Sequence, residues 1–176
     1  MEQDQQPSSQ PLFLHVPVSR VIAMSIVSMG LYNAYWIYKN YRYVKERERS
    51  RIWPFWRGIF GFFFCLGALR RIHENEEARS IRTPTFSPGW CYAGWVVLTL
   101  LARRFNYLED AVALVGPFIP SYLFFVPAQK YVNAVESQRR PGQPYYRWSS
   151  GHIVCLLIGV IAWICMVVGM FVPSGQ

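Results

Sequence analysis

The chain has 176 residues, of which 52% are hydrophobic and 17% aromatic, and its formal net charge is +8. A single domain is the expectation for this length. Its charged residues gather between long apolar blocks, a segregation that argues against a water-soluble domain, and the basic residues flank those blocks, which favours anionic lipid over nucleic acid as the partner.

Residues 1–17 are predicted to form a disordered N-terminal tail. Residues 1–10 are mostly Gln, Ser, Pro and acidic residues, which offer nothing to bury. Residues 1–17 contain no Lys or Arg, so we expect no cleavable signal peptide.

The first apolar block predicts a transmembrane helix over about 18–38, continuing to about Arg47. Residues 21–38 carry no charge, and 18 helical residues cover about 27 Å of the roughly 30 Å hydrocarbon core. The block ends in Tyr35, Trp36 and Tyr38 and is followed at once by a basic run, which is typical of the cytoplasmic end of a span. Asn33 lies inside the block, either in an interhelical hydrogen bond or in a polar pathway.

The second apolar block predicts an aromatic-rich interfacial or re-entrant helix over about 53–72. Arg57 interrupts the block and leaves only 12 apolar residues, 58–69, which is short for a span. Two interpretations of Arg57 stay open: its side chain snorkels to phosphate headgroups, or it binds an anionic headgroup between helices. A fifth span over this block is the alternative topology.

Three more spans are predicted in the second half of the chain, over about 89–107, 110–128 and 151–172, before a short tail at 173–176. The first follows a breaker loop at 83–89. The second contains Pro117 and Pro120, which kink a membrane helix. The fold class expected is therefore all-α, a polytopic membrane domain over 18–172 with four transmembrane helices and one interfacial helix.

The distribution of basic residues favours four spans over five. With the basic run after residue 38 inside, four spans place 15 of the 18 basic residues on one side and three on the other. Five spans give eight against nine, with Arg57 left in the membrane. Because cytoplasmic loops carry the excess of Lys and Arg, the four-span topology is preferred.

The residues predicted to contact lipid or its headgroups lie along the cytoplasmic face of this topology. They are Lys39, Arg42, Lys45 and Arg57, with Trp36, Trp53 and Trp56. We expect no catalytic residue, cofactor or metal, because the sequence lacks the usual nucleophile, zinc and phosphate-loop motifs, and its four cysteines form no ligand pattern. His73 and Glu77 are four residues apart, which is too few ligands for a metal site.

The segment from Gly30 to Lys39, GLYNAYWIYK, resembles a family of small bacterial multi-pass inner-membrane proteins. In that family the first span ends in a pattern of Gly, Tyr, Tyr-Trp and Tyr-Lys. The stretch around Pro54–Arg57 also resembles longer members, so the resemblance covers about 45 residues. It implies a bacterial inner membrane and carries no activity.

These patterns favour a non-enzymatic membrane protein with a structural, interaction or lipid-contacting role. Its expected partners are anionic membrane lipids and either a second copy or another membrane protein. A subunit of a small oligomeric channel or transporter is the alternative, motivated by the proline-containing span. A lipid-modifying enzyme using His73, Glu76 and Glu77 is a weaker third hypothesis.

Overall fold

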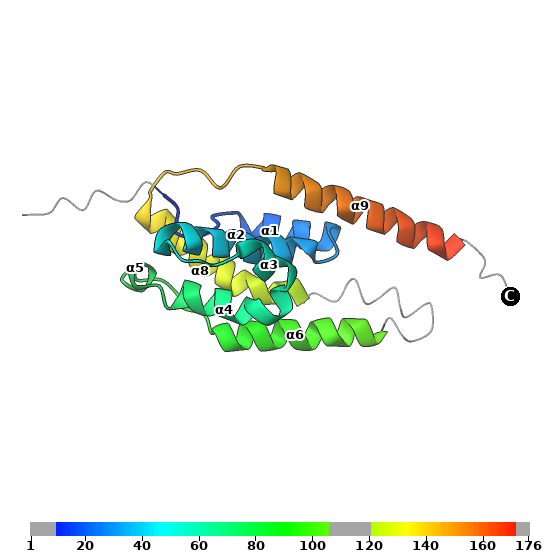
Figure 1. Ribbon diagram of the computed structural model, residues 1–176, viewed down its shortest axis with the longest axis horizontal. Helices are drawn as coiled ribbons and strands as arrows, with labels where there is room; N and C mark the ends of the chain where they lie inside the picture. Colours follow the sequence, from blue (N-terminus) through cyan, green and yellow to red (C-terminus); the bar gives the residue numbers. More distant parts are fainter. Residues whose placement is uncertain (1–9, 106–120, 172–176) are drawn as a thin grey trace, which may run out of the picture.

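The computed structural model describes residues 10–105 and 121–171, and every regular element within these ranges is helical, which confirms the all-α prediction there. Figure 1 shows α9 along one long edge of the molecule and α6 along the other, with α2 and α8 between them. In chain order the elements are α1 (Val18–Val27), α2 (Leu31–Glu48), α3 (Pro54–Ile59), α4 (Gly61–His73), α5 (Glu76–Arg79), α6 (Pro88–Phe105), the 3₁₀ helix η2 (Ser121–Phe125), α8 (Val126–Arg139) and α9 (Ser150–Phe171).

The predicted helix over 18–47 is wrong, because the chain turns sharply between α1 and α2. Met29 and Gly30 have φ angles of 48° and 88°, in the left-handed region that ends a helix. The Gly30 N–H donates to the Ser25 carbonyl at 2.9 Å and the Met29 N–H to the Ile26 carbonyl at 3.1 Å, the bond pair of a Schellman motif. The Ser28 hydroxyl then accepts from the Tyr32 N–H at 2.9 Å, which pairs one of the N–H groups in the first turn of α2.

After this turn α2 doubles back along α1. Arg20, near the start of α1, donates to the Tyr146 carbonyl at 2.5 Å, and Lys39, in the middle of α2, donates to the Tyr146 hydroxyl at 2.7 Å. The turn itself lies farther along α9, where Gly159 packs against the Val27 carbonyl. The two helices therefore form a hairpin, and the prediction of a single span over 18–38 is also wrong.

The hairpin's second helix, α2, is the centre of the fold. Tyr32, Trp36 and Tyr41 are each at most 1% exposed. The aromatic block expected as one interfacial helix over 53–72 is two helices, α3 and α4, separated at Phe60. Both pack on α2, and Gly58 permits the close approach, since a Cβ there would lie 2.8 Å from the Tyr38 Cβ.

The later elements agree in position with part of the prediction. α6 coincides within two residues with the span expected over 89–107. Of the span expected over 110–128, the part up to residue 120, including Pro117 and Pro120, lies outside the described residues, and the rest forms η2 and the start of α8. Pro127 lies in the first turn of α8, where a proline is tolerated.

Within the described ranges, one helix has the length and apolar composition to cross a bilayer. It is α9, over a 20-residue window from Ser150 to Gly169 that matches the span expected at 151–172. α1 and the Pro88–Leu101 part of α6 are apolar but shorter. Among the described residues the fold is thus all-helical, with one helix of spanning length.

Residues Gln10–Pro17, here called the strap, are not a tail. Leu12, Phe13, Leu14 and Val16 are each at most 3% exposed, and the backbone of this segment donates to side chains of α2 and α8. The prediction of disorder over 1–17 is therefore wrong for residues 10–17, because four apolar side chains there find a burial site. Residues 1–9 of the predicted tail and all of 173–176 lie outside the described residues.

Candidate functional site

Trp36, predicted to contact lipid headgroups, is a core residue instead. Its side chain is fully buried, and the indole Nε1–H donates to the Gln129 Oε1 at 2.7 Å. Its ring packs edge-on against Phe125, with centroids 5.3 Å apart. The prediction is wrong for Trp36, because the turn at Gly30 rotates α2 into the interior and buries this face between α8 and η2.

Lys39 and Arg57 are half-buried and occupied with aromatic neighbours. The Lys39 Nζ donates to the Tyr146 hydroxyl and lies 4.8 Å from that ring's centroid. The Arg57 guanidinium stacks over the rings of Tyr41 and Phe64, at 4.7 and 5.3 Å. Such cation–π contacts are favourable when partly desolvated. Lys39 therefore holds α2 to the segment before α9, and Arg57 holds α3 to α2 and α4, which limits their part in binding a ligand.

The remaining predicted residues converge on the corner between α2 and α3. Trp53 and Trp56 are 71% and 51% exposed, beside a cavity of about 580 Å³. Arg42 and Lys45 line this cavity together with Arg49, and Arg42 also pairs with Glu46 at 2.8 Å. The cavity, here called the basic groove, is lined further by Tyr38, Ser50, Pro54 and Phe55.

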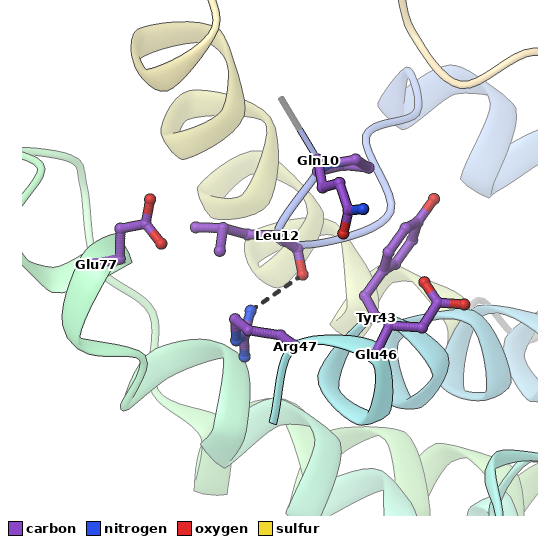
Figure 2. Close-up of a pocket in the computed structure, with 7 residues that line it drawn as sticks. Gln10, Leu12, Tyr43, Glu46, Arg47 and Glu77 are labelled. Carbon is purple, nitrogen blue, oxygen red and sulfur yellow. Dashed lines mark hydrogen bonds between the residues drawn. The ribbon is translucent and has the colours of Figure 1, made fainter. Parts of the chain in front are cut away.

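A second cavity, of about 590 Å³, lies where the strap meets α2 and α5. Figure 2 shows Gln10 of the strap beside Tyr43 and Glu46 of α2, while the Leu12 side chain extends toward Glu77 and the Leu12 carbonyl faces Arg47. The Arg47 guanidinium donates to the Leu12 carbonyl at 3.4 Å and lies over the Phe13 ring at 5.5 Å. Burial raises the pKa of Tyr43 to about 12 and lowers the pKa of Arg47.

The strap is held by polar side chains of α8 and α2 that sequence reasoning missed. The Glu136 Oε1 accepts from the backbone N–H groups of Leu12 and Phe13, at 2.6 and 3.0 Å. Its Oε2 accepts from Arg140 at 2.7 and 3.0 Å. Gln129 donates to the Leu14 and Val16 carbonyls at 3.0 and 3.1 Å. The N–H groups and carbonyls of the strap, a segment outside any helix, are thus paired with side chains.

His152, to which the sequence analysis assigned no role, is the centre of an aromatic cluster. Its Nδ1 lies 3.0 Å from the Ser149 hydroxyl, its Nε2 lies 3.4 Å from the Tyr32 hydroxyl, and the imidazole is fully buried. The four rings with centroids 5.0 to 5.9 Å from the imidazole are Tyr32, Tyr35, Tyr146 and Trp148.

The pair of Ser149 and His152 has the geometry of a helix cap. Ser149 precedes α9 and its N–H points to the His152 Nδ1 at 3.4 Å, as the third-residue side chain does in a capping box. Within the described ranges no carboxylate pairs with His152, so the orienting acid of a hydrolase triad is missing from this arrangement. The sequence signal for this cap was a serine three residues before a histidine at the start of an apolar run.

His73 and Glu77, the residues of the enzyme hypothesis, have structural partners. The His73 Nε2 lies 3.0 Å from the Thr85 hydroxyl, and Glu77 pairs with Arg139 of α8. Glu76 begins α5, whose Asn75 cap accepts from the Ala78 N–H at 2.9 Å. In the part of the chain that the structure describes, no three His, Cys, Asp or Glu side chains gather as metal ligands.

Comparisons with protein-family models, curated proteins and solved structures found no match for the chain. The residues of the GLYNAYWIYK segment hold structural positions in the fold. Gly30 forms the hairpin turn, and Tyr32 and Trp36 are core residues. Much of this motif thus serves to build the hairpin.

Replacing His15 by phenylalanine is expected to stabilise the protein, most strongly at acid pH. His15 is 6% exposed, stacks on Tyr145 at 4.5 Å, and neither ring nitrogen has a hydrogen-bond partner among the described residues. Burial lowers the pKa of His15, an effect opposed by Glu136 and assisted by Arg140. A phenylalanine keeps the ring and removes two unpaired polar atoms, a gain of about 1–3 kcal/mol.

The sign of the pH dependence follows from the lowered pKa. Above about pH 6.5 His15 is neutral in both states, and below it the unfolded chain binds the proton more readily, so acid destabilises the wild type by at most about 1.4 kcal/mol per pH unit. Chemical unfolding in detergent between pH 5 and 8 measures this. If the difference in unfolding free energy between His15→Phe and the wild type stays constant from pH 5 to pH 8, the lowered pKa assigned to His15 is contradicted.

Proposed function

We propose that the protein is an integral membrane protein without an enzymatic role, whose basic and aromatic end contacts anionic lipid headgroups. The supporting observation is the apolar surface of α9, where Leu157, Ile161, Ile164 and Val168 are all more than half exposed. Soluble monomers rarely expose apolar patches of this extent, whereas a lipid-facing helix requires them.

A second apolar surface lies on α3, α4 and α6 and extends this argument. Phe55, Trp56, Phe63 and Trp90 are 51–76% exposed there. The charged residues instead gather at the ends of α2 and α8 and around α5, at the opposite end of the molecule from the C-terminal end of α9 (Figure 1). An apolar body with one charged end has the distribution of a protein whose polar end lies at a membrane surface.

In the topology we propose, α9 crosses the bilayer with its N-terminal end at the charged, cytoplasmic side. The α1–α2 hairpin enters from that side and returns to it, so its two ends share one face. α6, whose Pro88–Leu101 part is apolar, is a further embedded helix. A bacterial inner membrane is the location implied by the resemblance at Gly30–Lys39, and a second copy or another membrane protein could cover part of α9.

Resistance to alkaline carbonate extraction tests the proposal. The wild type should stay in the membrane pellet, and Ile161→Asp/Ile164→Asp should be released or degraded, because two carboxylates near the centre of a span cost about 6 kcal/mol. Ile161→Val/Ile164→Val is the matched control and should behave as the wild type. On a water-facing helix the two aspartates would be tolerated. The proposal is therefore overturned if carbonate releases the wild type, or if the Asp variant stays in the membrane pellet as the wild type does.

A further inference from the structure

We infer that the basic groove between α2 and α3 is a binding site for the phosphate of an anionic membrane lipid, an inference that rests on the proposed function. Three cationic side chains of the last turns of α2 border one cavity: Arg42, Lys45 and Arg49. Arg49 ends the helix in the left-handed region, with φ 47°, and the chain then returns along α3, which closes the other wall.

The charges of the groove are only partly neutralised. The Arg42 Nε donates to Glu46 at 2.8 Å, and Tyr38 is a further hydrogen-bond partner of this side chain, so Arg42 is the most engaged of the three cations. Lys45 and Arg49 have no ion pair among the described residues. Three cations against one carboxylate leave a net charge of about +2, and guanidinium groups bind phosphate oxygens in a bidentate manner.

A polar atom without a partner points to the same ligand. The Ser50 hydroxyl is out of contact with solvent, lines the groove, and has no hydrogen-bond partner in the described part of the chain. Buried hydroxyls are nearly always paired, so the unpaired Ser50 hydroxyl in the wall of a cationic cavity is expected to turn toward an acceptor that enters the groove. A phosphate oxygen is such an acceptor.

The surroundings of the groove select a lipid over a soluble phosphate. Its α3 wall presents Pro54 and Phe55, and Phe55 is 60% exposed. Trp53 and Trp56 flank Pro54 and Phe55 in the sequence and are largely exposed, and tryptophan is enriched where headgroups meet hydrocarbon. A headgroup phosphate in the groove would therefore have its glycerol and acyl chains against apolar rings.

The test compares the affinity of the protein for phosphatidylglycerol with its affinity for phosphatidylcholine, each lipid being supplied in nanodiscs. The full-length protein is purified in mild detergent, and the lipid it retains is counted by native mass spectrometry. The groove variant is Arg42→Gln/Lys45→Gln/Arg49→Gln. Its matched control, Arg70→Gln/Arg79→Gln/Lys130→Gln, removes the same charge from exposed residues without ion pairs in the described ranges. Circular dichroism and the thermal transition establish that both variants are folded.

The wild type should prefer phosphatidylglycerol, and the groove variant should bind it about 100-fold more weakly, since each basic contact is worth about 1 kcal/mol. The control and Ser50→Ala should lose at most about tenfold. Equal affinity of the wild type for both lipids, or an equal loss in both triple variants, overturns the site. Competition by inorganic phosphate as effective as that by the lipid overturns the lipid assignment. Insertion itself is judged separately by carbonate extraction.

Discussion

Replacing Glu136 by alanine is expected to lower the free energy of unfolding by about 3–5 kcal/mol, the usual cost of leaving a buried charge uncompensated. Glu136 is 1% exposed and has two roles at once. One oxygen accepts from the Leu12 and Phe13 N–H groups, and the other accepts from Arg140, whose side chain is only 15% exposed. Alanine leaves all three partners unpaired in a site that water barely reaches.

Glu136→Gln separates the hydrogen bonds from the charge. The amide can still accept from the strap but cannot neutralise Arg140, so we expect a loss of about 1.5–3 kcal/mol. Glu74→Gln, at an exposed position, is the control and should change stability by at most about 0.5 kcal/mol. Chemical unfolding in detergent gives the energies.

Limited proteolysis of the folded variants tests the same assignment locally. The strap should become sensitive to protease in Glu136→Ala before the rest of the chain does, because its N–H groups have lost their acceptor. A variant as stable and as protected as the wild type would show that Glu136 does not hold the strap.

Replacing Gly159 by alanine, which adds one methyl group, is expected to lower the free energy of unfolding by about 1–3 kcal/mol, the usual cost of overpacking. A Cβ at this position would lie 2.2 Å from the Val27 carbonyl oxygen and 2.5 Å from the Ser28 Cα. Both atoms are backbone at the turn of the α1–α2 hairpin, so neither can rotate away. Gly159→Ala must therefore push α9 off the hairpin.

Gly169 of the same helix provides a control with the opposite sign. Nothing lies within 4 Å of a Cβ there, so Gly169→Ala should be neutral or stabilising by up to about 1 kcal/mol, the difference in helix propensity. Thermal unfolding of both variants in one detergent measures the pair. Equal behaviour of the two alanines would contradict the packing of α9 on the turn.

Hydropathy in the sequence was sufficient to place α9 and α6, because a long apolar run has few alternatives to a helix. It was misleading at Gly30, where the run continues through a turn. Glycine at the end of an apolar segment is a known helix stop signal, and Ser28 can cap the helix that follows. The apolar composition outweighed that local signal, so the predicted span continued past the end of α1 into α2.

The candidate site was predictable only in part. Arg42, Lys45, Trp53 and Trp56 are close in sequence, so they stay together whatever the tertiary fold. Trp36 shared their composition but faces the core, which depends on how α2 packs against α8. The partners of the strap on α8 lie more than 110 residues away in sequence, beyond anything a local pattern encodes.

The strap also sets the order in which the protein can be completed during synthesis. The Leu12 N–H pairs with Glu136, 124 residues later in the chain, and the His15 carbonyl accepts from the Tyr146 N–H. At about 5–20 residues per second, a ribosome takes roughly 6–25 s to make that intervening chain. Through this interval Leu12, Phe13 and Leu14 lack their burial site, so the earliest apolar side chains of the described fold are among the last to be covered. Such nonlocal closure slows folding and leaves a short hydrophobic segment open to chaperones or to the bilayer surface until α8 is made.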